Sequence, residues 1–216
     1  MRLTHGRLAL ELHEVTRGDG PSLLLLHALY SSSAQWSEAP IAWPGSVYAL
    51  DFCGHGRSDW VGGGAYYSEL LVADADVALA HIGRAVVVGA GLGAYVALLL
   101  AGGRPDLVPA ALLLPGAGLA GGGPLPDFAG RRLPMDQPTR DEPAGTHDPL
   151  VRVLDRDVRP PDYVEPFARA AHRLLLEEDG STRPPWWEAV RAAPAAELAP
   201  PELSLALARL AAEIRR

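Results

Sequence analysis

The sequence predicts a three-layer α/β/α sandwich with a mostly parallel sheet, and three observations support this fold class. Strand-like and helix-like segments alternate along the first half of the chain, an order that places helices on both faces of a parallel sheet. Several strand-like segments are short continuous apolar runs, which are typical of strands buried on both faces. The length of 216 residues suits one domain better than two, so we expect a single domain over residues 1–216.

The strands expected in the first half differ in their hydrophobic pattern. Residues 8–15 alternate between apolar and polar side chains, which predicts a half-buried strand at the edge of the sheet. Continuous apolar runs predict buried strands at residues 23–26, 47–50, 85–88 and 110–114. Helical patterns predict helices at residues 33–39, 68–82 and 92–101.

The second half begins with a segment rich in glycine and proline. Because residues 115–149 show no periodicity, we assign residues 115–160 to a loop or lid, with an insertion lacking fixed structure as the alternative. Within this segment His147 and Asp148 could close over a pocket, although we expect a solvated turn. The tail predicts helices at 161–171, from 184 onward and at 201–216, and a strand at 174–176 that could instead end the first of these helices. The cap and the C-terminal part are therefore expected to be reduced.

Charge and composition exclude several classes of function. A net charge of −7 argues against nucleic acid or an anionic membrane as a partner. All 19 basic residues are arginine, and the absence of lysine excludes Schiff-base, pyridoxal-phosphate and P-loop lysine chemistry. The single cysteine, Cys53, excludes an internal disulfide and a cysteine zinc cluster. We therefore expect neither a cofactor nor a metal.

The N-terminus carries no sign of targeting. Residues 1–6 lack the apolar core of a signal peptide. No uninterrupted apolar run approaches the length of about 18 residues needed to span a membrane. We expect a cytoplasmic protein that does not span a membrane.

Three motifs follow successive predicted strands. They are LHAL at residues 26–29, DFCGHGRS at 51–58 and GAGLG at 89–93. This series resembles the α/β-hydrolase fold superfamily, in which strands end in His-Gly-x, Asp-x-x-Gly-x-Gly-x-Ser and the nucleophile elbow Gly-x-Ser-x-Gly. The resemblance covers roughly residues 8–115.

The resemblance implies a site at the third motif. The backbone amides of Leu29 and Leu92 would form an oxyanion hole, and Tyr30 and Gly91 would border it. Two N–H groups aimed at one point can hold a carbonyl or carboxylate oxygen. The start of the helix at Leu92 adds to the preference for negative charge.

The resemblance gives the other motif residues supporting roles. His27 would brace the loop that presents the first amide, and His55 would be a packed or capping histidine. Asp51 opens the loop beside the site. None of these residues is the family's nucleophile, acid or histidine.

The departures from the family pattern affect the catalytic triad itself. The elbow serine is Gly91, and no histidine follows Asp179, which is the natural candidate for the acid. Glycine relaxes a turn that is strained in other residues. The N-myc downstream-regulated proteins, which are regarded as non-hydrolytic, resemble this chain in placing glycine at the elbow. We therefore expect a pseudoenzyme that keeps a pocket for a small apolar acid or ester.

Two alternatives stay open. The first is an active ester or lactone hydrolase, a lyase or an isomerase of the same superfamily that uses Asp51, Cys53, His55 and Asp179, although a lone buried cysteine is more typical of inert core. The second is dinucleotide binding through Gly89-x-Gly91-x-x-Ala94. That reading needs an acidic residue after the strand at 110–114, where the sequence has Pro115.

The tail could also contribute a binding surface. The pair Trp186-Trp187 and the apolar closing helix are expected to pack onto the sheet. The alternatives are a ligand pocket lined by the tryptophans and a homo-oligomer formed through the helix.

Overall fold

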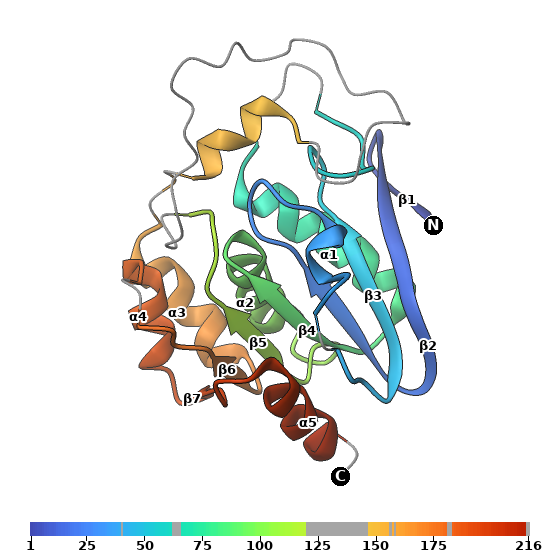
Figure 1. Ribbon diagram of the computed structural model, residues 1–216. Helices are drawn as coiled ribbons and strands as arrows, with labels where there is room; N and C mark the ends of the chain where they lie inside the picture. The colour runs from blue at the N-terminus through green and yellow to red at the C-terminus, as the bar shows by residue number, and fades with distance from the viewer. Residues whose placement is uncertain are drawn as a thin grey trace.

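A seven-stranded sheet forms the centre of the protein in the computed structural model, which describes residues 1–39, 41–61, 66–119, 147–155, 157, 159–180 and 183–214. The sheet order is β1-β2-β4-β5-β6-β7, with β3 paired to β2 (Figure 1). The strands are β1 (Arg2–His5), β2 (Leu8–Leu26), β3 (Gly45–Asp51), β4 (Ala85–Ala90), β5 (Ala111–Leu114), β6 (Leu174–Leu176) and β7 (Ala196–Leu198). The pairs from β2–β4 to β6–β7 are parallel, which confirms the mostly parallel sheet.

Strand β3 lies between two parts of β2. Leu50 of β3 is opposite Leu12 in the first part of β2 and opposite Leu26 in its last part. The first part is flanked on its other side by β1, where Leu3 is opposite Leu10. The prediction that residues 8–15 form a strand is confirmed, but their edge position is wrong because β1 takes the edge. Strand β1 has only four residues, too few for an alternating apolar pattern that would predict it.

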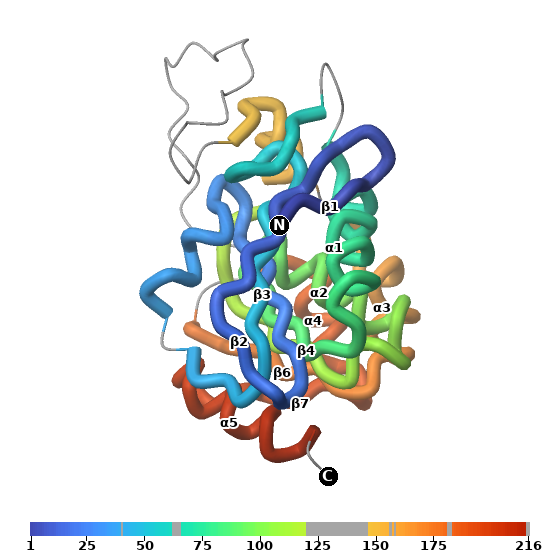
Figure 2. The backbone as a smooth tube through the Cα atoms, turned by 90° about the vertical axis from the view of Figure 1, so that its right-hand side faces the viewer, coloured from blue at the N-terminus to red at the C-terminus, as the bar shows by residue number. Residues whose placement is uncertain are grey.

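Helices cover both faces of the sheet. One face carries α1 (Ser68–Ile82), α2 (Leu92–Gly103), α3 (Pro161–Ala170) and α4 (Pro185–Arg191), and the other carries α5 (Leu203–Ile214) and the 3₁₀ turn η1 (Ser33–Trp36). Figure 2 shows α1, α2 and α3 on one side of the strands and α5 on the other. A further 3₁₀ turn, η2 (Pro149–Leu154), follows the segment outside the described residues. These layers confirm the α/β/α sandwich.

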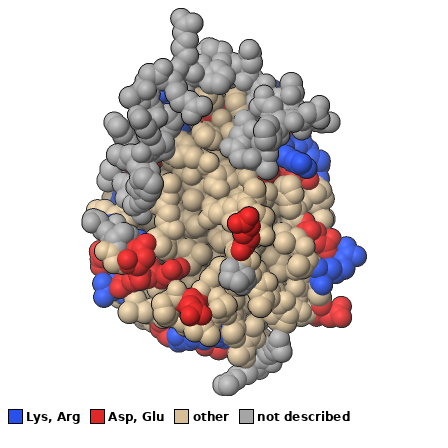
Figure 3. All heavy atoms as spheres, in the orientation of Figure 1, with Lys and Arg blue, Asp and Glu red and all other residues tan. Residues whose placement is uncertain are grey.

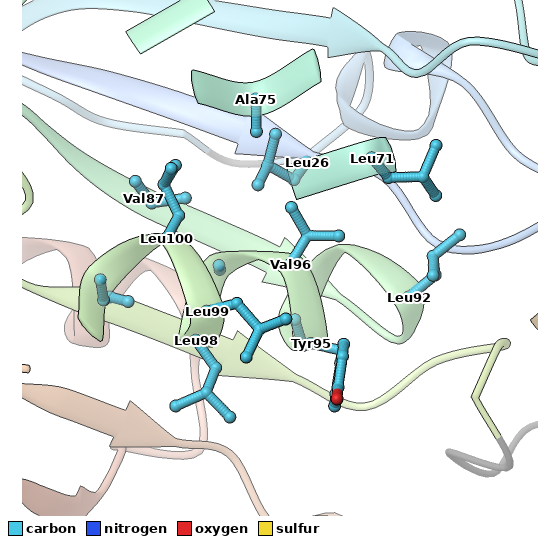
Figure 4. Close-up of a cluster of buried hydrophobic side chains, with 14 of the residues drawn as sticks. Leu26, Leu71, Ala75, Val87, Leu92, Tyr95, Val96, Leu98, Leu99 and Leu100 are labelled. Carbon is cyan, nitrogen blue, oxygen red and sulfur yellow. The ribbon is translucent and has the colours of Figure 1, made fainter. Parts of the chain in front are cut away.

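Alternation along the central strand β4 divides the core in two. Val87 packs with the cluster beneath α1 and α2, whereas Val86 and Val88 pack with the cluster beneath α5. Because α2 is buried along most of its length, both of its sides contribute: Figure 4 shows Val96 on one side and Tyr95 on the other. Each such buried side chain stabilises the fold by about 1.5–3 kcal/mol.

Several elements differ in detail from those expected from the sequence. The strand at 174–176 is confirmed as β6, and the next strand, β7, was not predicted because three residues of Ala-Glu-Leu carry little pattern. The helix expected at 33–39 is reduced to η1. Most of the expected loop at 115–149 lies outside the described residues, which resume at His147.

Candidate functional site

The elbow between β4 and α2 keeps the backbone geometry of a sharp strand-to-helix turn. Gly91 has φ 52° and ψ −113°, a region that glycine reaches without the penalty of a Cβ atom. A Cβ atom built on Gly91 would lie 2.2 Å from the carbonyl oxygen of Ala117 and 2.5 Å from the carbonyl carbon of Gly116. The space directly over the elbow therefore belongs to the chain's own backbone.

The amides of Leu29 and Leu92 converge on one acceptor. The N–H of Leu29 donates to the carbonyl oxygen of Ala117 at 3.1 Å, and the N–H of Leu92 donates to the same oxygen at 2.9 Å. An oxyanion hole holds a carbonyl oxygen through two such donors. In this protein the oxygen is supplied internally by Ala117.

Further hydrogen bonds hold the segment that carries Ala117. Before it, the N–H of Gly91 donates to Leu114 O at 3.0 Å. After it, the N–H of Leu119 donates to Leu154 O at 2.6 Å, and the indole N–H of Trp186 donates to Leu119 O at 3.3 Å. The carbonyl of Ala117 is thus positioned by β5, η2 and α4 together.

Two glycines let this segment approach α2 closely. A Cβ atom on Gly116 would lie 2.8 Å from the backbone nitrogen of Gly91, and one on Gly118 would lie 2.8 Å from the Cβ atom of Leu92. Larger residues at either position would push the backbone away from the elbow. The Gly-Ala-Gly sequence is therefore what allows the Ala117 oxygen to reach both amides.

His27 is a structural residue in a fixed neutral form. Its Nδ1–H donates to Ala28 O at 2.7 Å, while its Nε2 accepts the N–H of Phe52 at 3.2 Å. Burial lowers the pKa of His27. With both ring nitrogens in hydrogen bonds, the side chain braces the loop that presents Leu29 and has no free nitrogen for proton transfer.

Asp51 is a buried carboxylate whose oxygens are all in use. Oδ1 accepts the N–H of Ser33 at 2.7 Å, and Oδ2 accepts the N–H of Arg57 at 2.9 Å and Nε2 of His13 at 3.1 Å. Burial alone would raise the pKa of Asp51, but the bonds from His13, Arg57 and Ser33 outweigh it and lower the pKa to about 2. The ionised form is stabilised, so the group is a poor proton acceptor near neutral pH.

His55 is fully buried beside His27. Its Nδ1 lies 3.2 Å from Cys53 O, and its Nε2 has no hydrogen-bond partner among the residues that the structure describes. Burial, reinforced by His27, lowers the pKa of His55 well below its ordinary value. The imidazole is held neutral in the core, as expected for a packed histidine.

Cys53 is equally inaccessible. Its thiol is fully buried, and burial together with the carboxylate of Asp74 raises the pKa far above that of a free thiol. A reactive cysteine needs a stabilised thiolate and access to solvent or substrate. Cys53 has neither, which fits inert core.

Asp179 follows β6 and lies partly exposed at the surface. Its side chain is 45% exposed and forms an ion pair with Arg183 at 2.8 Å. The last histidine of the chain, His172, precedes β6. The structure therefore brings Asp51, Cys53 and His55 into one loop and places Asp179 apart from them at the surface.

Sequence reasoning gave too little weight to His147 and Asp148. Asp148 is buried and accepts the hydroxyl of Tyr66 at 2.8 Å and the N–H of Leu150 at 2.9 Å. His147 forms an isolated β-bridge with His55. The expectation of a solvated turn is wrong, because these contacts fasten the segment onto the second motif. An aspartate directly before Pro149 is a helix N-cap signature that could have revealed it.

Tyr30 lies at the same end of the sheet. It has a positive φ of 64°, and its ring lies 5.1 Å from the ring of His147. Tyr30 therefore contacts the segment that resumes at His147, next to the amide of Leu29. Of the four expected ligand-binding residues, Leu29 and Leu92 donate to the internal carbonyl, Gly91 lies directly against it, and Tyr30 follows Leu29 in the chain.

A metal site, a membrane span and a dinucleotide site each have structural requirements that can be compared with the described residues. Within the described ranges, no group of three or more His, Cys, Asp or Glu side chains is arranged to hold a metal ion. Among these residues, no helix combines the length and apolar character that crossing a bilayer requires. The amides of Gly91 and Leu92, which a dinucleotide would need, donate to Leu114 and Ala117.

A family model and curated relatives match much of the same chain. The model of the Alpha/beta hydrolase family matches residues 23–214. The uncharacterized protein Rv2715 of Mycobacterium tuberculosis is 34% identical over 107 residues, which cover 47% of this chain and 31% of that relative. The match thus spans less than a third of the curated relative.

Solved structures resemble the whole chain at low identity. A hypothetical protein, PA1622 of Pseudomonas aeruginosa PAO1, has a TM-score of 0.71 at 18% identity and covers 100% of this chain and 99% of its own. The thioesterase domain from the curacin biosynthetic pathway has a TM-score of 0.67 at 18% identity, with 100% and 98% covered. Est816, an N-acyl homoserine lactone degrading enzyme, has a TM-score of 0.68 at 19% identity, with 100% and 99% covered. These likenesses concern the fold.

Proposed function

Because the chain belongs to the alpha/beta hydrolase family, we propose that it is a member without serine-hydrolase activity. One observation carries the proposal: the oxygen of Ala117 accepts both the Leu29 and the Leu92 amides. In an active enzyme those two donors stabilise the oxygen of the substrate as charge develops on it. Here a substrate oxygen would have to compete with a carbonyl of the same chain.

The side chains near the elbow support the same conclusion. Gly91 supplies no nucleophile. Asp51 has its oxygens in three hydrogen bonds, Cys53 is buried, and both nitrogens of His27 are in use. Covalent catalysis needs a nucleophile within reach of a general base, and the described residues around Gly91 offer no such pair.

The ligand that fits the proposal is a small apolar acid or ester. The amides of Leu29 and Leu92 require an acceptor oxygen, and the side chains of these two residues are apolar. Such a ligand binds by replacing the Ala117 oxygen at both amides. Since one acceptor is exchanged for another, the affinity depends mainly on how much apolar surface the ligand buries.

An activity-based probe tests the loss of hydrolysis. The natural protein and a Gly91→Ser variant are treated with a fluorophosphonate and assayed with a butyrate ester, beside an active serine esterase as control. We expect no labelling and no turnover in either form, because the new serine would contact Ala117 and lacks a histidine. A covalent adduct on any residue of the natural protein would overturn the proposal.

The ligand class has its own test. Octanoate is titrated into the natural protein while the backbone amide resonances of Leu29 and Leu92 are followed by NMR, with octanol as the matched control. We expect the two resonances to shift together and to saturate with octanoate only. If they stay unchanged, the ligand assignment fails while the loss of hydrolysis still stands.

A further inference from the structure

An open groove lies at the end of β3 on the face of the sheet that carries η1. It has a volume of about 280 Å³, and its lining includes His13, Val15, Trp36, Ala49, Asp51 and Arg57. Alternation along the strands explains the lining: His13 is opposite Ala49 in the pairing of β2 with β3, and residues two apart point to the same face. The groove is thus built from β2, β3, η1 and the loop after β3.

The floor of the groove offers no free acceptor. Asp51 is 1% exposed, and its carboxylate accepts hydrogen bonds from Ser33, Arg57 and His13. The carboxylate keeps its negative charge, and at 1% exposure its oxygens are out of reach of a donor from a ligand. A ligand in the groove must therefore find its polar partners elsewhere.

Two donors around the groove lack acceptors. The indole Nε1 of Trp36 is buried without a hydrogen-bond partner in the part of the chain that the structure describes, and the residue is only 5% exposed. Within the same ranges, the guanidinium of Arg57 has neither an ion pair nor a hydrogen bond, although its backbone N–H and carbonyl are both bonded. The indole N–H of Trp36 carries the cost of a buried donor without an acceptor, typically about 1–3 kcal/mol. Arg57 is an exposed residue, so water hydrates its guanidinium until a ligand replaces it.

The remaining lining is apolar. Val15, Ala34 and Ala49 join the ring of Trp36, and Val15 is an exposed large hydrophobic residue. Figure 3 shows that uncharged atoms predominate on this face, with one acidic group near its centre and the other charged groups toward its margins. A flat apolar ring bearing acceptor oxygens matches the apolar walls and the exposed guanidinium of Arg57.

We propose that this groove binds a small aromatic carboxylic acid. The carboxylate pairs with the guanidinium of Arg57, whose planar fork suits two acceptor oxygens. The aromatic ring lies against Trp36 and the small apolar side chains, where stacking and burial both contribute. The assignment uses neither Gly91 nor Ala117, so it does not rest on the function proposed for the elbow.

Benzoate is the probe for this site, and benzamide is its uncharged control. Binding to the natural protein is followed by NMR through the indole N–H resonance of Trp36 and the backbone amides of the groove. We expect saturable shifts with benzoate, with a dissociation constant on the order of 1 mM for so small a ligand, and affinity weaker by about tenfold for benzamide.

Two arginine variants decide whether the groove is the site. Arg57→Ala should weaken benzoate binding by about tenfold, whereas Arg17→Ala removes a nearby arginine that is paired with Glu14 and should leave binding unchanged. Equal benzoate affinity in the natural protein and the Arg57 variant, or shifts at Leu29 and Leu92 in place of Trp36, would overturn the assignment. Absence of hydrolysis would not affect it, so the two proposals fail separately.

Discussion

The elbow and the groove lie near the same end of the sheet but are built in opposite ways. At the elbow, backbone donors meet a backbone acceptor, and two glycines let the chain close over the corner. In the groove, the guanidinium of Arg57 is exposed without an acceptor among the described residues, and both oxygens of Asp51 already accept hydrogen bonds. At the elbow, the amides of Leu29, Gly91 and Leu92 all have backbone acceptors. In the groove, the guanidinium of Arg57 remains available to an acceptor from a ligand.

This difference shows where a ligand can bind in a chain whose elbow residue is glycine. Satisfied backbone groups make a corner stable and unreactive, because any ligand must first replace an existing hydrogen bond. An exposed guanidinium beside an apolar wall offers a ligand both a charged partner and apolar surface to bury. The following substitutions test the two halves of this contrast.

The largest effect is expected from Gly91→Ala at the closed corner. The new methyl group combines a positive φ with contacts to Gly116 and Ala117, so we expect a loss of at least about 3 kcal/mol in the free energy of unfolding. Gly6→Ala is the matched control, since Gly6 has φ +61° but nothing within 4 Å of an added Cβ atom, and should cost about 1 kcal/mol.

Denaturant unfolding of both variants separates the cost of a positive φ, which both share, from the cost of steric contact with Gly116 and Ala117, which only Gly91→Ala has. If Gly91→Ala costs no more than Gly6→Ala, the Ala117 segment does not pack over the elbow in solution. The contrast between a closed corner and an open groove would then be lost.

A smaller effect is expected at the floor of the groove. The pKa of Asp51 is lowered to about 2 from 3.8, so its ionised form contributes about 2 kcal/mol to stability above pH 4. Because the folded pKa is the lower one, this contribution is lost as the pH falls from about 4 through 2. Asp51→Asn should lower stability at pH 7 and remove this part of the acid dependence.

Unfolding curves measured from pH 7 down to pH 2 provide the check for Asp51. Asp76→Asn is the control, because Asp76 is partly exposed and pairs with Arg104 near the surface, where an ion pair contributes about 0.5 kcal/mol. Parallel pH profiles for the natural protein and Asp51→Asn would contradict the saturated carboxylate.

The smallest effects compare two aspartates at the borders of the site. Asp148→Ala removes the acceptor for Tyr66 and for Leu150, and should cost about 1–2 kcal/mol. Asp179→Ala removes a half-exposed pair with Arg183, and should cost at most about 0.5 kcal/mol. Thermal unfolding measures both, and a larger loss for Asp179→Ala would mean that the acid position retains a structural role.

Hydrophobic pattern and turn chemistry were enough to predict the sheet and the elbow. Valines 86 to 88 and the glycines that follow specify strand, turn and helix locally, and Gly91 has a φ of 52° in the turn that was expected to be strained for other residues. The strand at 174–176 was favoured because a charged turn follows it, and β6 is there. These features depend on residues close together in the chain, so the sequence carries them.

The closure of the elbow could not be predicted in the same way. The acceptor is a backbone oxygen, which every residue has, so Ala117 carries no side-chain signature. The glycines on either side of it were noted only as a change in composition, although their spacing is what permits the close approach. The role of Asp148 depends on Tyr66 and Gly54, which are far away in the sequence and become neighbours only in the folded chain.

The position of β3 between the two parts of β2 has a consequence for how the chain assembles during synthesis. The N-terminal ribbon of β1 and the first part of β2 joins the sheet's hydrogen bonds through β3, so it must wait until residue 51 has emerged before it can dock. In the finished protein the same ribbon shields one side of β3. Its detachment would expose a long unpaired strand, the kind of edge through which chains aggregate.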